Sequence, residues 1–153
     1  MQEAFCALGL LCQIKTKPTN SSFDILKGMD TALPVRWVKS VGGDFLDLLR
    51  VNLEAPYFAA PVLGVYVIWY TGAKKAPVVK VGQGNIKDQI IANRTNIQVT
   101  QYSASGQMKI SWVIVNRQNF DGVEAFLYDY YKPLVGERNR AVKSIPVTPL
   151  LSL

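Results

Sequence analysis

Four side chains downstream of residue 60 carry groups that can take part in catalysis: a phenol, an ammonium, a guanidinium and a carboxylate. They are Tyr66, Lys80, Arg94 and Glu124. These groups matter because the 153 residues include no histidine and only two cysteines. For the chain acting alone, that composition excludes zinc sites built on histidine or cysteine, a Ser-His-Asp triad and a Cys-His dyad. Catalysis would therefore use carboxylates, tyrosine, lysine, arginine or a metal held by oxygen atoms.

The hydrophobic pattern predicts the strands that must position the first two of these side chains. Strands are expected over residues 64–71, 78–81 and 109–116. The first two are close enough in sequence to form a hairpin, whose loop carries Lys74 and Lys75. In the third, Ile110, Trp112 and Ile114 alternate as residues on one face of a strand do.

Two helices are expected to carry Arg94 and Glu124. Asn85 can cap the first helix, in which Ile86, Ile90 and Ile97 recur on one side. The second opens at Asp121 and ends at Lys132–Pro133. Its apolar residues follow the i, i+3, i+4, i+7 rule and are Val123, Phe126, Leu127 and Tyr130.

The predicted order β-β-α-β-α indicates an α+β fold with a small three-stranded, mainly antiparallel sheet flanked by helices. Residues 61–153 would form the domain that carries the function. Residues 1–60 would be an N-terminal extension that packs on this core and is not an independent domain. Within it, Gly42–Asp44 predicts a turn and a helix N-cap ahead of a helix over 45–50.

The order of motifs resembles that of the GIY-YIG nucleases over roughly residues 62–140. Gly64–Tyr66 reads GVY where the family has GIY, and Lys80–Gly82 reads KVG on the next strand where it has YIG. A helix glutamate, Glu124, is followed by apolar residues, a proline and Asn139, as in the late segment of the family. Lysine thus replaces the first tyrosine of YIG. The family arginine usually falls earlier in its helix than Arg94, nearer Gln89, and the position near Asn93 is often histidine or tyrosine.

The resemblance implies a Mg²⁺- or Mn²⁺-dependent endonuclease that hydrolyses phosphodiesters in DNA. Tyr66 would be the general base, and Lys80 beside it would lower the pKa of its phenol. Arg94 would hold the scissile phosphate, and Glu124 would ligate one divalent ion. Further substrate contacts would come from Lys74, Lys75, Lys87 and Asn139.

Each candidate also has a structural interpretation. Glu124 lies three residues after Asp121 and could complete a capping box. Tyr66 could be an ordinary half-buried strand residue, and Arg94 a solvated residue at a helix C-terminus. Asn139 could cap its own backbone in a loop. Lys80, within an otherwise apolar strand, indicates either a sheet edge or a face open to a ligand.

The net charge of +6 lies entirely downstream of residue 59, where eleven basic residues face five acidic ones. That excess is compatible with a polyanionic partner, such as DNA. Two other functions stay open: a nucleic-acid-binding module of the same fold that has lost catalysis, and a structural or interaction domain. The oligomeric state stays open as well.

We expect no membrane partner and a cytoplasmic location. The apolar stretch from Ala4 to Cys12 is short and lacks a basic region before it. The uncharged run from Ala55 to Ala73 is interrupted by prolines and glycines and is rich in β-branched and aromatic residues, as a buried strand would be. The two thiols, six positions apart, are expected to be reduced.

Overall fold

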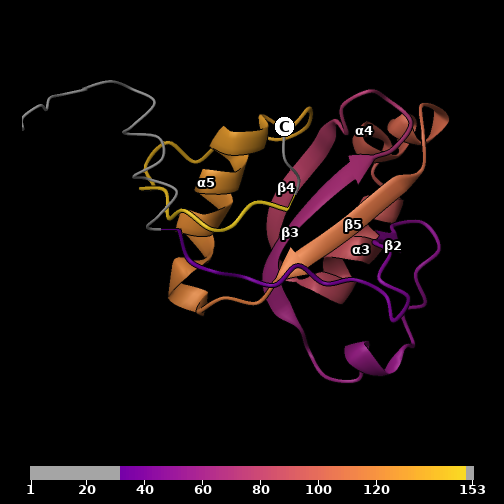
Figure 1. The fold of residues 1–153 in the computed structure, drawn as a ribbon, viewed down its shortest axis with the longest axis horizontal. Helices are drawn as coiled ribbons and strands as arrows, with labels where there is room; N and C mark the ends of the chain where they lie inside the picture. The colour runs from indigo at the N-terminus through magenta and orange to yellow at the C-terminus, as the bar shows by residue number, and fades with distance from the viewer. Residues whose placement is uncertain (1–31, 151–153) are drawn as a thin grey trace, which may run out of the picture. The chain divides into compact units, whose positions relative to one another are not determined.

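The computed structural model describes residues 32–150 (Figure 1). Residues 33–150 belong to one compact unit, which includes residues 33–60 of the predicted N-terminal extension. The expectations for Ala4–Cys12 and for the two thiols lie outside the described residues. Among residues 32–150, helices are too short or too polar to traverse a bilayer.

The described residues form a mixed α+β fold around one antiparallel sheet, as predicted. Its elements, in chain order, are β2 (Leu46–Asp47), η2 (Pro56–Phe58), β3 (Leu63–Tyr70), β4 (Val78–Asn85), α3 (Ile86–Arg94), α4 (Ile97–Thr100), η3 (Gln101–Ala104), β5 (Met108–Val113), η4 (Arg117–Asn119) and α5 (Phe120–Tyr131). The strand order is β2-β5-β3-β4, so the sheet has four strands where the sequence predicted three. The additional strand is the two-residue β2, which pairs with β5.

The helix predicted over residues 45–50 is wrong. Leu46 pairs with Ile110 of β5, and Leu46 and Leu48 both enter the core. Asp47 then closes a turn, because its side chain accepts a hydrogen bond from the backbone N–H of Leu49 at 2.9 Å. A short acidic side chain that binds nearby backbone in this way competes with helix formation.

The sheet separates two hydrophobic layers. Ile86 and Ile90 of α3 belong to one layer, and Val123 and Leu127 of α5 belong to the other. Figure 1 shows α5 on one side of the sheet and α3 on the other. The central strand β3 is buried on both faces, so Tyr66 reaches the α3 layer, while its neighbours in sequence reach the α5 layer.

The first predicted helix is confirmed at its start but not at its end. The Asn85 side chain accepts a hydrogen bond from the Asp88 N–H at 3.4 Å, which makes it the expected N-cap. Ile86 and Ile90 are fully buried. The helix stops at Arg94, however. Ile97 begins a separate short helix, α4, and the Ile97 residue itself is 75% exposed. The prediction that Ile97 shares the buried side of α3 is therefore wrong.

The third strand and the last helix differ from their predicted bounds at the ends. β5 stops at Val113, which leaves Ile114 outside the strand and 68% exposed. α5 begins at Phe120, one residue before the predicted start. It ends as predicted, because Lys132 takes the left-handed conformation at φ 49°.

The chain after α5 covers only the first part of β4. Backbone N–H groups of Leu134 and Val135 donate to the carbonyls of Val78 and Val79 at 3.1 and 2.8 Å. β4 is the last strand of the sheet. From Lys80 onward, side chains of both helices reach β4: Asn93 of α3 accepts a hydrogen bond from Lys80, and Asp121 and Glu124 of α5 accept from Gln83.

Candidate polar site at the edge of strand β4

Tyr66 lies in the middle of β3, where it pairs with Gly82 of β4. A Cβ atom on Gly82 would overlap the Tyr66 hydroxyl and ring, so glycine leaves the space through which the ring crosses β4. The hydroxyl donates to Gln89 Oε1 at 2.9 Å and accepts from Asn93 Nδ2 at 3.2 Å. Tyr66 is 1% exposed, so it is fully buried, not half-buried.

The environment of Tyr66 stabilises its neutral form. The pKa of the phenol is raised to about 12: burial is the main cause, the charge of Glu124 adds to it, and the hydrogen bond from Asn93 opposes it. The prediction that Lys80 lowers this pKa is wrong. Lys80 pairs with Ile68 instead of Tyr66, and its ammonium donates to Asn93 Oδ1 at 3.2 Å.

Lys80 is half-buried on the edge strand, and the sheet edge is one of the two positions that the sequence indicated for it. A bulge helps to place it, because Ile68 pairs with Lys80 and Trp69 pairs with Val78, which leaves Val79 as an additional residue. Its acceptor, Asn93, is 1% exposed and also donates to the Gln89 carbonyl at 2.7 Å. Asn93 therefore joins β3, β4 and α3 through one carboxamide.

Glu124 approaches the same edge from α5. Gln83 Nε2 donates to Glu124 Oε1 at 2.9 Å and to Asp121 Oδ1 at 2.7 Å. Burial raises the pKa of Glu124, and the charge of Asp121 raises it too, while Gln83 and Lys80 lower it. The capping-box interpretation is wrong, because Asn119 is the N-cap residue and Asp121 lies inside the helix.

Three of the four predicted catalytic residues thus meet around β4. Tyr66 and Lys80 both bind the Asn93 side chain. The negative charge of Glu124 raises the pKa of Tyr66. The positive charge of Lys80 lowers the pKa of Glu124. The sequence analysis assigned no role to the carboxamides that connect these groups. One signal for them was available: Gln89 and Asn93 lie four residues apart, so they share one face of a helix.

Arg94 does not join this group. Its Nε donates to the Leu48 carbonyl at 2.7 Å, and its Nη2 donates to the Val51 carbonyl at 2.6 Å. It is the last residue of α3, but its guanidinium is not simply solvated. The Arg94 side chain therefore connects α3 to the turn that follows β2.

The predicted substrate-binding residues are dispersed. Lys74 and Lys75 are exposed in the loop between β3 and β4. Lys87 pairs with Glu54 at 3.5 Å. Asn139 accepts a hydrogen bond from the Ala141 N–H at 3.1 Å, as its structural interpretation predicted. Asn139 also lines a small hollow together with Glu124.

The carboxylates at this edge could supply some, but not all, of the ligands of a divalent ion. Residues 32–150 contain no cluster of three or more histidine, cysteine, aspartate or glutamate side chains that could hold a metal ion by itself. Glu124 and Asp121 nevertheless place two hard oxygen donors around one carboxamide. Mg²⁺ commonly binds through one or two carboxylates, with water and phosphate oxygens completing its octahedron.

Comparison with protein-family models, with curated proteins and with solved structures gives no match.

Proposed function

We propose that the chain is a Mg²⁺-dependent phosphodiester hydrolase that acts on DNA, with its site at the edge of β4 and an arrangement like that of the GIY-YIG nucleases. One observation carries this proposal: Tyr66, Lys80 and Glu124 come from three different elements and converge around one strand edge. When the four-residue helix α4 and the 3-10 helices are set aside, the order β3-β4-α3-β5-α5 also matches the order that the sequence resemblance implies.

Lys80 and Glu124 supply complementary charges in this proposal. The ammonium of Lys80, held by Asn93, would face a phosphate oxygen. Glu124, with Asp121 beside it, would hold the divalent ion, and Gln83 orients both carboxylates. When bound, such an ion stabilises negative charge on the phosphate oxygens. Arg94 has no part in it, because its guanidinium holds the Leu48 and Val51 carbonyls.

Tyr66 would act as the general base that takes a proton from the attacking water. Its pKa of about 12 leaves few molecules with a phenolate at neutral pH. A base of this kind gives a rate that rises about tenfold for each pH unit through the neutral range, until another group becomes limiting. That dependence distinguishes Tyr66 from a base with an ordinary carboxyl pKa.

Nicking of supercoiled plasmid DNA in Mg²⁺ or Mn²⁺ tests the proposal. Glu124→Gln and Lys80→Met should each reduce the rate by about 100-fold or more, because each removes a charge that stabilises the transition state. Asp44→Asn is the matched control, because Asp44 is an exposed carboxylate in the loop before β2. Absence of cleavage by the wild type, or equal cleavage by wild type and Glu124→Gln, would contradict the proposal.

A second candidate function is nucleic-acid binding without catalysis. Two observations favour it: the raised pKa of Tyr66, and the two hydrogen bonds that hold the Arg94 guanidinium on backbone carbonyls within the fold. In that case wild type and Glu124→Gln would both fail to nick DNA but would bind it, with an affinity that falls steeply as salt rises. Binding that is absent, or insensitive to salt, would contradict this candidate.

A further inference from the structure

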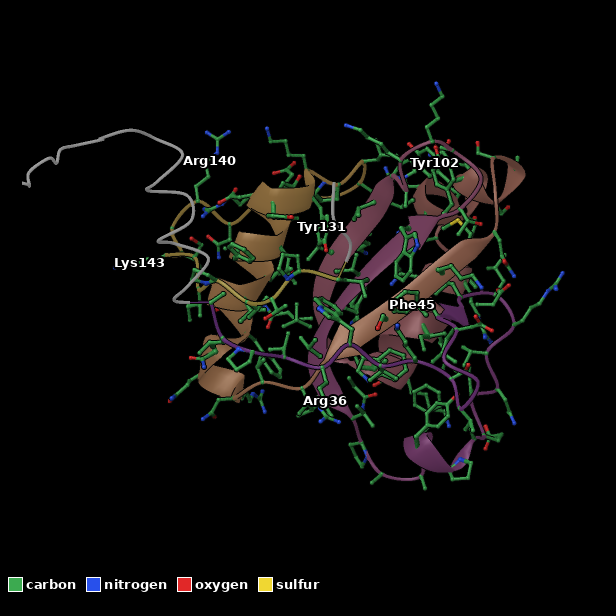
Figure 2. The ribbon with its side chains drawn as sticks, in the orientation of Figure 1. Arg36, Phe45, Tyr102, Tyr131, Arg140 and Lys143 are labelled. Carbon is green, nitrogen blue, oxygen red and sulfur yellow. The ribbon has the colours of Figure 1, made fainter. Side chains whose placement is uncertain are left out.

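A second hollow lies apart from the edge of β4. Its lining residues are Arg36, Trp37, Lys39, Phe45 and Leu150. Trp37 and Phe45 pack on the same hydrophobic layer as α5. Figure 2 labels Arg36 and Phe45, which lie on the extended segment that leads into β2. None of the residues that line the site around Glu124 lines this hollow.

We propose that this hollow binds single-stranded nucleic acid, with phosphates on Arg36 and Lys39 and a base against Trp37. The inference goes beyond the proposed hydrolase activity and does not depend on it. Its basis is the combination of fixed aromatic rings with cations that lack acidic partners in the lining.

The aromatic part of the hollow is held in place by the fold. Phe45 packs edge-on against the buried ring of Trp69, with centroids 5.0 Å apart and planes at 83°. Trp37 is half-buried, and its indole Nε1 donates to the Thr148 carbonyl at 2.9 Å. Rings fixed in this way lose little conformational entropy when a base stacks on them.

The cations surround these rings without compensation by lining carboxylates. Lys39 Nζ lies 4.8 Å from the centroid of the Phe45 ring, and Lys109 Nζ donates to the Phe45 carbonyl at 3.3 Å. Arg36 is exposed. Within the described part of the chain, Arg36, Lys39 and Lys109 form no ion pair with a carboxylate. The hollow therefore presents positive charge beside aromatic surface.

Single-stranded nucleic acid fits this combination better than the other polyanions do. Its phosphates match the cations, and its unpaired bases expose faces that stack on aromatic side chains. In a duplex the bases already stack on one another, so the aromatic surface would gain little. An acidic peptide would pair with the cations but would leave the ring of Trp37 without a stacking partner.

The fluorescence of Trp37 provides a direct test. The other two tryptophans, Trp69 and Trp112, are 2% exposed, so quenching by an added oligonucleotide should report mainly on Trp37. We would titrate the full chain with oligo-dT, oligo-U, a duplex of equal charge and poly-glutamate. We expect quenching by one or both single strands, with weaker binding of the duplex and of poly-glutamate, and loss of the quenching in Trp37→Phe.

Charge substitutions keep the test valid if Trp37→Phe does not fold. The double variant Arg36→Gln/Lys39→Met should weaken single-strand binding about tenfold. The slope of log K against log salt concentration should become shallower by about one, because about one fewer counterion is released. The pair Lys74→Gln and Lys75→Met removes equal charge from the exposed hairpin loop and should change binding less than threefold. Equal effects of the two pairs, tighter binding of the duplex or of poly-glutamate, or no single-strand binding would each overturn the inference.

Discussion

The two sides of β4 differ in how their polar groups are satisfied. On the α3 side, the Tyr66 hydroxyl, the Asn93 carboxamide and the Lys80 ammonium bind one another or Gln89. On the α5 side, one carboxamide, that of Gln83, serves two carboxylates. Each carboxylate can accept about four hydrogen bonds, so Asp121 and Glu124 keep more unused acceptor positions, and more exposed ones, than Tyr66 and Asn93 do.

This difference assigns different tasks to the two sides. A closed network of buried polar groups fixes geometry, and breaking it leaves unsatisfied donors and acceptors. A pair of carboxylates with spare lone pairs can accept a ligand without breaking the fold. We therefore expect substitutions on the α3 side to lower stability, in addition to any loss of activity when Tyr66 or Lys80 is replaced. Substitutions on the α5 side should change mainly ligand binding and activity.

Gly82→Ala should have the largest effect on stability. The new Cβ would overlap the Tyr66 ring, which is enclosed between β4 and α3, so the ring and its hydrogen bonds must move. Forcing additional atoms into a packed core costs typically about 1–3 kcal/mol and occasionally more, and we expect the upper end here. Urea unfolding measures the loss.

A matched glycine provides the control for Gly82→Ala. A Cβ on Gly42 would lie 3.8 Å from Ser40 Oγ, which is ordinary contact, so Gly42→Ala should change the free energy of unfolding by less than about 0.5 kcal/mol. Equal stability of the two variants would show that the α3 side is not closed.

Asn93→Leu should be the next most damaging change. It removes the acceptor of Lys80 and donors to Tyr66 and to the Gln89 carbonyl, all at a position that is 1% exposed. Leaving such partners unsatisfied costs about 1–3 kcal/mol. Gln98→Leu substitutes an exposed carboxamide and should be nearly neutral in urea unfolding. A loss for Asn93→Leu no larger than that of Gln98→Leu would contradict the network.

Gln83→Leu makes the corresponding change on the α5 side and should cost less than about 1 kcal/mol. The substitution leaves two carboxylates without this donor. Asp121 is exposed and Glu124 is half-buried, so water can replace the lost hydrogen bonds. Because Gln83 lowers the pKa of Glu124, its removal should raise that pKa further, which carboxyl-selective NMR can follow. A stability loss equal to that of Asn93→Leu would remove the distinction between the two sides.

Local pattern predicted most of the fold. Strand alternation and helical spacing located β3, β4, β5, α3 and α5, because each buries an apolar face against the sheet. β2 escaped prediction, because two residues carry no period and its pairing with β5 joins residues distant in sequence. The end of α3 at Arg94 was also missed, since Asn96 caps a new helix within what reads as one continuous pattern.

The candidate site was less accessible from sequence. Spacing within elements placed Tyr66, Lys80 and Glu124 on β3, β4 and α5, but which groups bind each other depends on strand register and on how far a side chain reaches. The register pairs Tyr66 with Gly82 and not with Lys80. Burial of the phenol then raises the Tyr66 pKa, which is opposite to the predicted direction. Arg94 turned toward backbone carbonyls of a distant segment, which no local pattern encodes.

The smallest expected effect is the pH dependence of stability that arises from Glu124. Burial raises the pKa of this carboxyl, so the folded protein holds the proton more tightly than the unfolded chain does. The stabilisation is complete below the ordinary carboxyl pKa and is lost as the pH rises through the raised value. Glu124→Gln cannot ionise, so as the pH rises above the ordinary carboxyl pKa of about 4 it should gain stability relative to the wild type.

The partial exposure of Glu124 keeps this change in the free energy of unfolding below about 1 kcal/mol. Urea unfolding at a series of pH values measures it, and a difference that stays constant or reverses would mean that the carboxylate side of β4 is not desolvated.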